Sequence, residues 1–285
     1  MAILQTQGLT FVYGKNTPYQ KEAVTNVNLK IEEPCLAALI GHTGSGKSTL
    51  VQMLNGLVKP TEGKVFLDGK DIWEDEKNIR QIRFKVGIVF QYPEYQLFED
   101  TVEKDIAFGP KNLGLNDEEI KQRVLWAADC VDLNRDLLTK SPFDLSGGEK
   151  RRAAIAGVLA MKPEILILDE PTAGLDPKGR DNLLSQIVKY QKENNKTVII
   201  VSHSMEDVAK IADQVFVMCN GCLEMSGTAK EIYSNCQKLE EMSLSVPQIT
   251  KLMNKIKQKG FDVEGNILTV DQAVKALLKL KGGAK

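Results

Sequence analysis

The stretch GHTGSGKST, Gly41 to Thr49, stands between a short apolar run and a segment with helical periodicity. The run Leu36–Ile40 is typical of a buried strand, and apolar residues recur on one helical face from Leu50 to Leu57. A strand, a glycine-rich turn and a helix together direct backbone N–H groups toward a phosphate. The pattern G-x-x-x-x-G-K-[ST] is met in full by Gly41, Gly46, Lys47 and Ser48. The stretch therefore predicts a nucleotide-binding protein.

The composition limits the classes of protein to consider. The chain has 285 residues, 42% of them hydrophobic, and a formal net charge of −1. This length suits one large or two modest domains, and the balanced charge argues against a domain wrapped in nucleic acid. No apolar run approaches the roughly 18 residues of a membrane-spanning helix, and the N-terminus lacks a signal-peptide pattern. We expect a cytosolic protein whose membrane role, if any, comes through a partner.

Short apolar runs alternate with helical segments along most of the chain. Two strand-like runs, Ile3–Val12 and Val24–Ile31, come first, and the residues from about 94 to 159 are mostly helical in pattern. Further short strands are predicted at Val65–Leu67, Val86–Phe90, Ile165–Leu168 and Val198–Val201, with a helix over Pro177–Asn194. Such alternation is typical of an α/β fold with a parallel sheet.

The pattern changes after about Gln237. Pro247–Lys259 carries apolar residues at helical spacing, and Thr269–Gln272 has the form of a capping box before another helix. We predict a small C-terminal helical appendage over residues 237–285. Its lysines are most simply a solvated face, with membrane-surface or nucleic-acid binding as the alternatives.

The five cysteines include a C-x-x-C pair, Cys219 and Cys222. The two residues between them, Asn220-Gly221, are the preferred pair for a two-residue hairpin turn. No second pair of cysteines or histidines completes a zinc site. We therefore predict a β-hairpin here rather than a metal or redox centre.

Two adjacent carboxylates, Asp169 and Glu170, follow the apolar run Ile165–Leu168. A strand that ends in this way places them at the carboxyl edge of the sheet, where ligands bind in open α/β folds. Asp169 suits a Mg²⁺ partner, and Glu170 could polarise an attacking water. The alternative is that the two carboxylates are solvated side chains at an ordinary strand end. The presence of the phosphate loop favours the functional interpretation.

A second predicted anion-binding turn is Leu145–Glu149, with sequence LSGGE, just before a helix. One nucleotide does not need two such turns. The chain resembles the ATP-binding cassette (ABC) family, the ATPases of ABC transporters, over roughly residues 3–230, and LSGGE is the signature of that family. The resemblance implies a P-loop ABC cassette with an N-terminal antiparallel β subdomain, a parallel-sheet core and an inserted helical subdomain, over residues 1–236. It also implies that two cassettes pair head to tail, so that the signature acts on the ATP of the partner through Ser146, Gly147, Gly148 and Glu149.

The resemblance assigns further residues to the site. ATP binding is expected at Tyr13, Gly41, His42, Thr43, Gly44, Ser45, Gly46, Lys47, Ser48, Thr49 and Gln91. A Mg²⁺ ion is expected at Ser48, Gln91 and Asp169, catalysis at Glu170 and His203, and the D-loop role at Asp176. Tyr19 is the alternative to Tyr13 for stacking on adenine. Ala173 stands where the family more often has Ser.

The segment Phe90–Asn112, FQYPEYQLFEDTVEKDIAFGPKN, resembles the ATPases of energy-coupling factor transporters, as does the C-terminal segment from Val246 onward. Its aromatic cluster is either packing of the helical subdomain or a docking groove. The resemblance is strongest to the second of the two ATPase types of that subfamily. It implies a heterodimer with a related ATPase, a transmembrane T component that receives the motion, and exchangeable S components that carry vitamins or other micronutrients. It also implies that the chain lies at the cytoplasmic face of the membrane, attached through these partners. No nucleic-acid partner is expected.

Three alternatives remain open at this stage. The first is the ATPase of a dedicated cobalt or nickel importer, the second that of an ordinary ABC transporter, and the third a non-transport ABC protein. The third is disfavoured because the compact segment between Lys47 and Ser146 leaves no room for the long coiled coil of DNA-repair members.

Overall fold

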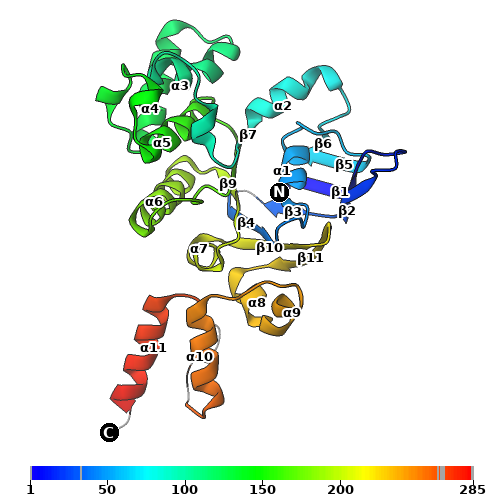
Figure 1. The fold of residues 1–285 in the computed structure, drawn as a ribbon, viewed down its shortest axis with the longest axis vertical. Helices are drawn as coiled ribbons and strands as arrows, with labels where there is room; N and C mark the ends of the chain where they lie inside the picture. Colours follow the sequence, from blue (N-terminus) through cyan, green and yellow to red (C-terminus); the bar gives the residue numbers. More distant parts are fainter. Residues whose placement is uncertain (1, 33, 262, 264–266, 284–285) are drawn as a thin grey trace.

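The computed structural model of the chain describes residues 2–32, 34–261, 263 and 267–283. Two β-sheets form the body of the molecule, with a lobe of helices on one side and a pair of helices projecting at the C-terminal end (Figure 1). The expected antiparallel N-terminal sheet and parallel-sheet core are confirmed.

The first sheet comes from the N-terminal part of the chain. Its strands follow the order β2-β1-β5-β6, with β3 also paired to β1, and every pairing is antiparallel. The strands are β1 (Ala2–Tyr13), β2 (Lys21–Val27), β3 (Lys30–Glu32), β5 (Glu62–Leu67) and β6 (Lys70–Asp71).

The predicted strand Val24–Ile31 is wrong as a single element, because β2 ends at Val27 and β3 begins at Lys30. The hydroxyl of Thr6 bridges the break: Thr6 Oγ1 donates to Val27 O at 2.8 Å and accepts from Leu29 N at 2.8 Å. A side chain from the neighbouring strand thus satisfies the backbone groups that a continuous ladder would have paired. The apolar pattern runs on through the break because Val27 and Leu29 are both buried.

The second sheet has the order β11-β10-β4-β9-β8-β7. All its pairings are parallel except that of the edge strand β11. The strands are β4 (Leu36–Gly41), β7 (Val86–Val89), β8 (Ile165–Asp169), β9 (Thr197–Val201), β10 (Gln214–Cys219) and β11 (Cys222–Gly227). Strands β4, β8 and β9 are buried along their whole length, as their unbroken apolar runs predicted. Because these strands are parallel, their carboxyl ends meet at one edge.

The helices divide into three groups. Helix α1 (Lys47–Leu54) follows the phosphate loop and α2 (Ile79–Lys85) precedes β7, while α3 (Val102–Asn112), α4 (Asp117–Cys130) and α5 (Gly147–Leu159) form the lobe predicted at residues 94–159. The remaining helices follow β8 and β9 and then lead to the C-terminus: α6 (Pro177–Asn194), α7 (Met205–Ile211), α8 (Ala229–Ser234), α9 (Cys236–Glu241), α10 (Gln248–Gln258) and α11 (Val270–Gly283).

The predicted hairpin and capping box are confirmed. Cys219 and Cys222 face each other across β10 and β11, and Asn220 and Gly221 have φ values of 47° and 82°, as a type I′ turn requires. At the start of α11, Gln272 Oε1 accepts from the backbone N–H of Thr269 at 3.3 Å, while the backbone N–H of Gln272 donates to Thr269 Oγ1 at 3.3 Å.

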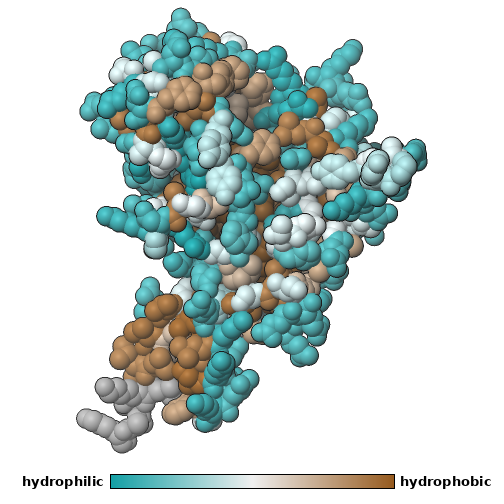
Figure 2. Space-filling view, viewed as in Figure 1, coloured by the Kyte–Doolittle hydropathy of each residue, from teal (hydrophilic) through white to brown (hydrophobic). Residues whose placement is uncertain are grey.

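Helices α10 and α11 extend away from the two sheets (Figure 1). They share a small core of their own, made by Met253, Val263, Ile267 and Ala273. Apolar side chains also remain exposed on this part of the chain, which Figure 2 shows as a brown surface at the C-terminal end: Leu252, Phe261, Val270, Val274, Leu277 and Leu278. We propose that residues 1–236 form the cassette and 237–285 the appendage, with residues 239–246 packed back on the cassette.

Candidate nucleotide-binding site

The carboxyl ends of β4, β7, β8 and β9 open into one cavity of about 660 Å³. Residues from separate parts of the chain line it: Gly41, His42, Thr43, Gly44, Lys47, Ser48, Gln91, Asp169, Glu170, His203, Met205, Ser243, Leu244 and Ser245. Most residues predicted for the site therefore lie together. Ser45, Gly46 and Thr49 belong to the same loop and helix but do not line the cavity, and Ser45 is fully buried behind it.

The phosphate loop has the backbone conformation that its glycines allow. Gly44 and Gly46 have φ values of 83° and 98°. A Cβ at Gly41 would lie 2.4 Å from the Met218 carbonyl oxygen, so only glycine fits this close approach. Within this described segment, Gly46 starts α1 without a side-chain cap, and the first turn carries no acidic residue. The free N–H groups of α1 and its dipole thus suit a phosphate.

Lys47 turns back onto the loop that precedes it. Its Nζ donates to the carbonyl oxygens of Gly41 at 2.8 Å and His42 at 3.0 Å. Burial lowers the pKa of Lys47, while the neighbouring carboxylates of Glu170 and Asp169 act in the opposite direction. The ammonium group is thereby held at the mouth of the loop, where terminal phosphates would lie.

Ser48 and Asp169 form the oxygen-rich corner of the cavity. Ser48 Oγ donates to Asp169 Oδ2 at 3.1 Å, although the two residues are 121 positions apart. Burial raises the pKa of Asp169, whereas the hydrogen bond from Ser48 lowers it. A hydroxyl and a carboxylate, with the amide of Gln91 lining the same cavity, are ligands that suit Mg²⁺, which keeps further positions for water and phosphate oxygens. Among the described residues no cluster of three or more His, Cys, Asp or Glu side chains forms a metal site independent of phosphate.

Glu170 and His203 face each other in the same cavity. His203 Nδ1 lies 2.7 Å from Glu170 Oε2, and the Glu170 side chain is only 13% exposed. Glu170 adopts a left-handed φ of 50°, and its backbone N–H donates to Val201 O at 3.0 Å. This unusual conformation turns its side chain away from that of Asp169, so the two adjacent carboxylates take different positions.

The segment that carries His203 is fixed from behind by a partly buried ion pair. Arg180 Nε, from α6, donates to both carboxylate oxygens of Asp207 at 2.8 and 2.7 Å. Asp207 also lies 3.3 Å from the Thr172 hydroxyl, and its backbone N–H donates to Ser204 Oγ. The residues just after Glu170 and just after His203 are therefore joined through one carboxylate, a link that no sequence motif indicated.

Tyr13 lies beside the phosphate-loop helix. Its hydroxyl is 3.1 Å from Thr49 Oγ1, and its ring packs edge-on against Phe11 with centroids 4.8 Å apart. Tyr13 is half exposed, whereas Tyr19 is 88% exposed. This placement supports Tyr13 over Tyr19 as the side chain that stacks on adenine.

We expect Tyr13→Ala to weaken ATP binding about three- to tenfold, the size of one aromatic stacking contact, and Tyr19→Ala to leave it unchanged. Equilibrium titration with a fluorescent ATP analogue measures both variants. Weaker binding by Tyr19→Ala alone would contradict the assignment and favour Tyr19.

The signature lies apart from this cavity. Ser146 caps α5 through a capping box in which Ser146 Oγ and Glu149 Oε2 are 2.6 Å apart, and Gly147 and Gly148 form the first turn. None of these four described residues lines the cavity, and α5 belongs to the helical lobe in Figure 1. Asp176 in turn caps α6, accepting from Gly179 N at 2.8 Å. The arrangement supports action of the signature on a second nucleotide rather than on its own.

One buried arginine joins the segments around the site. Arg151, on α5, is 4% exposed and donates through Nε and Nη2 to both carboxylate oxygens of Glu94, at 3.1 and 2.8 Å. Its Nη1 donates to the carbonyl oxygens of Pro171 at 3.1 Å and Ala173 at 2.7 Å. The residues after Gln91, the signature helix and the loop after Glu170 thus meet at one guanidinium. The sequence offered no signal for this role, because Arg151 stands in an ordinary basic run.

Residues 24–173 match the model of the ABC transporter family. This chain belongs to the ABC transporter family. Among curated members of that family, the energy-coupling factor transporter ATP-binding protein EcfA2 of Clostridium acetobutylicum is 54% identical over 99% of this chain and 99% of its own length. The EcfA2 of Caldanaerobacter subterraneus subsp. tengcongensis is 49% identical over the same shares. Within the ABC family, the chain therefore belongs to the energy-coupling factor ATP-binding proteins.

Solved structures of ABC cassettes confirm the fold. CbiO1 of Clostridium perfringens, described as part of the ABC transporter complex cbiONQ, aligns with a TM-score of 0.76 and 39% identity, over 89% of this chain and 99% of its own. A cassette solved as a dimer in a post-hydrolysis state bound to ADP and Pi aligns with a TM-score of 0.71 and 30% identity, over 79% of this chain and 98% of its own. In the part of this ABC protein that the structure describes, no helix combines the length and hydrophobicity that crossing a membrane requires.

Proposed function

We propose that this chain is an ATP-hydrolysing subunit of an energy-coupling factor importer for vitamins or other micronutrients. In this proposal it pairs with a second, related ATPase at the cytoplasmic face of the membrane. A transmembrane T component receives its motion, and exchangeable S components bind the substrates. The observation that carries the proposal is that one segment, starting at Gln91, borders both the nucleotide cavity and an apolar groove.

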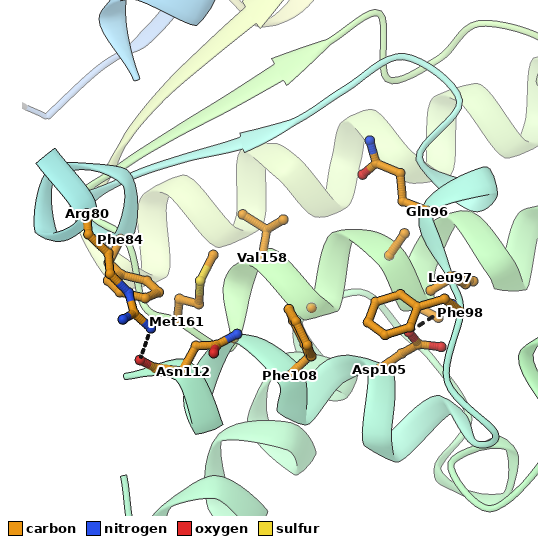
Figure 3. A pocket seen from close by; sticks show the side chains of 14 residues that line it. Arg80, Phe84, Gln96, Leu97, Phe98, Asp105, Phe108, Asn112, Val158 and Met161 are labelled. Atoms are coloured by element: carbon orange, nitrogen blue, oxygen red, sulfur yellow. Dashed lines mark hydrogen bonds between the residues drawn. The ribbon is translucent and has the colours of Figure 1, made fainter. Parts of the chain in front are cut away.

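The groove has a volume of about 410 Å³ and lies in the helical lobe (Figure 3). Phe98 and Phe108 stand on one side of it with their rings edge to face, 5.1 Å between centroids, and both remain about half exposed. The lining also includes Arg80 and Phe84 of α2, Val158 of α5 and Met161 just after α5. An exposed apolar groove of this kind suits a helix of a membrane partner.

Only part of the aromatic cluster singled out in the sequence takes part in the groove. Leu97 and Phe98 line it, whereas Tyr92 and Tyr95 lie outside it with ring centroids 6.2 Å apart. Tyr95 is 84% exposed, so it does not pack the interior of the lobe either. The proposed docking groove therefore includes Leu97 and Phe98 but not Tyr92 or Tyr95.

The chemistry follows from the side chains around the cavity. Glu170 accepts a hydrogen bond from the attacking water and orients it toward the γ-phosphate, while His203, whose Nδ1 lies 2.7 Å from Glu170 Oε2, contacts the γ-phosphate. Lys47 offsets the charge that develops on the phosphate oxygens. A Mg²⁺ ion, when held by Ser48, Gln91 and Asp169, would neutralise charge on the β- and γ-phosphates. Loss of the γ-phosphate removes contacts that hold two cassettes together. The cassettes then move apart, and this motion is passed to the T component.

The distance of the signature from the nucleotide cavity also supports pairing. Four signature residues that lie away from it would complete the ATP site of a partner if two cassettes associate head to tail. Helices α10 and α11 pack on each other but leave apolar side chains exposed, as Figure 2 shows. These side chains support a further contact, between the C-terminal appendages of the two paired cassettes. A dedicated cobalt or nickel importer is the second candidate, because CbiO1 from a cbiONQ complex shares 39% identity with this chain.

A pulldown of the tagged chain from its native membranes in mild detergent tests the proposal. Recovery of a related ATPase, one shared multi-span protein and several different small membrane proteins is expected. One fixed permease pair would point to an ordinary transporter, and a single dedicated substrate-binding protein would favour the metal importer. Ribosomal or DNA-associated partners without a membrane protein would overturn the transport role.

We expect Phe98→Asp to reduce recovery of the multi-span protein at least tenfold, because it places a charge beside Phe108 in the apolar lining of the groove. Tyr95→Asp is the matched control, since Tyr95 is a neighbouring aromatic residue outside the groove. Quantitative mass spectrometry of the same pulldown measures both. Equal recovery in the two variants would contradict the assignment of the groove.

A further inference from the structure

One wall of the nucleotide cavity comes from the C-terminal part of the chain. Ser243, Leu244 and Ser245, which lie between α9 and α10, line it together with His203 and Met205. The other lining residues belong to the phosphate loop, to the first turn of α1 and to the carboxyl ends of β7 and β8. The mechanism proposed above does not use this wall.

The wall is held in a specific conformation. Ser243 has a left-handed φ of 58°, a conformation that a serine keeps only where the surroundings impose it. Two backbone hydrogen bonds fix the turn: Ser243 N donates to Glu240 O at 2.9 Å, and Leu244 N donates to Leu239 O at 2.8 Å. The side chain of Leu244 is buried as a result.

The same segment is attached to helix α7, which starts two residues after His203. Leu244 and Val246 belong to one buried cluster with Met205 and Val208 of α7. Gln248 N, in the first turn of α10, donates to Glu206 Oε1 at 3.3 Å. The N-cap of α10 is Pro247, which offers no side-chain cap, so the Glu206 carboxylate also faces a helix N-terminus, where a negative charge is favoured.

The backbone that carries His203 thus rests on the C-terminal segment from one side. The imidazole is 73% exposed, so packing around the ring does not fix its place, and its position depends on the start of α7. Arg180 and Asp207 hold α7 to α6 from the other side. A displacement of α10 would be passed to His203 through Leu244 and Glu206.

We propose that Leu244 and Glu206 are positioning residues that hold His203 against Glu170 and couple the placement of α10 and α11 to ATP hydrolysis. The catalytic meaning of this coupling rests on the proposed function. A partner appendage that binds α11 would then influence the hydrolysis step from outside the cassette. We expect ATP binding itself to change little, because Lys47 and the backbone groups that suit the phosphates belong to the phosphate loop and α1 rather than to this segment.

The chain has two histidines, His42 and His203, and both line the cavity. Their imidazole signals in the NMR spectrum of the full chain can therefore be followed separately, with His42→Gln for assignment. We expect Leu244→Ala to shift the His203 signal toward that of a free imidazole and to leave the His42 signal in place. Ile232→Ala is the matched control, because it removes a buried aliphatic side chain of the same cluster that does not line the cavity.

An unchanged His203 signal in Leu244→Ala would overturn the proposal, and so would an equal shift in Ile232→Ala, which would show general loosening. Leu244→Met, which conserves volume, is expected to restore the wild-type signal. If Leu244→Ala does not fold, Glu206→Ala serves instead, since it removes no buried apolar group; Glu206→Gln keeps the acceptor and is its control. An unshifted His203 signal in Glu206→Ala would likewise overturn the proposal.

Steady-state ATP hydrolysis by the pulled-down complex gives a second readout. We expect the Leu244→Ala complex to lose about tenfold in kcat, as for a misplaced catalytic group, with KM for ATP within about twofold of wild type. A rise in KM with unchanged kcat would overturn the positioning role. If the wild-type complex does not hydrolyse ATP, the proposed function fails, and the NMR comparison still decides whether this segment positions His203.

Discussion

The Glu170→Gln variant is expected to bind ATP normally and to hydrolyse it about 10²- to 10⁴-fold more slowly than wild type, the range for loss of a general base. The amide keeps nearly the same shape and can still contact His203, which lies 2.7 Å from Glu170 Oε2. It lacks the charge needed to attract a proton from water. The phosphate-loop groups that hold the nucleotide are untouched, so two cassettes should stay closed around ATP.

Single-turnover hydrolysis by the complex, together with nucleotide retention on gel filtration, measures this effect. Glu224→Gln is the control, because Glu224 is an exposed carboxylate on β11 outside the cavity. Normal turnover by Glu170→Gln in its complex would reject the role given to Glu170. Loss of ATP binding as well as turnover would show that the carboxylate holds the nucleotide instead.

The Arg151→Ala variant is expected to lose about 3–5 kcal/mol in free energy of unfolding, as when one partner of a buried ion pair is removed. Arg151 is 4% exposed, and its loss leaves Glu94 and two carbonyl oxygens, of Pro171 and Ala173, without their donor. Arg135→Ala is the matched control, since Arg135 forms a similar two-bond pair with Asp129 on the surface. There the expected loss is about 0–1 kcal/mol.

Chemical denaturation of the purified chains measures both variants, and equal losses would contradict the structural role of Arg151. The loop after Glu170 depends on the same guanidinium, so we also expect Arg151→Ala to lower ATP turnover. Restored turnover in Arg151→Lys would show that the charge alone is sufficient. The fork of donors in the structure predicts that it is not.

The contribution of the Arg151–Glu94 ion pair to the free energy of unfolding should decrease as the pH falls. Burial raises the pKa of Glu94, but hydrogen bonds from Arg151 outweigh it and hold the pKa below the ordinary value of 4.5. A carboxyl whose pKa is lower in the folded state stabilises the fold above its unfolded pKa and loses that contribution as pH falls. The difference in unfolding free energy between wild type and Glu94→Gln should therefore shrink below pH 4.5. Denaturation curves at pH 7 and pH 4 test this, and a constant difference would contradict it.

Much of the site could be predicted because parallel strands end at one edge. Four predicted strands of the second sheet carried functional residues shortly after their last apolar position, as with Gln91 and His203. The strand order itself was not needed, since any parallel arrangement brings those ends together. The break between β2 and β3 could not be predicted, because the hydroxyl that bridges it belongs to Thr6, on another strand.

The sequence by itself determined the local chemistry: the phosphate loop, the carboxylates after β8, the signature turn and the hairpin at Asn220-Gly221. Each of these depends on a few adjacent residues whose backbone preferences and side chains act together. Only the tertiary structure decided which distant groups support them. Arg151 meets Glu94 across 57 positions, and Ser243–Ser245 reach a cavity built mainly by residues 41–203. Such contacts depend on how helices and loops pack over the sheet edge, and packing leaves no periodic mark in the sequence.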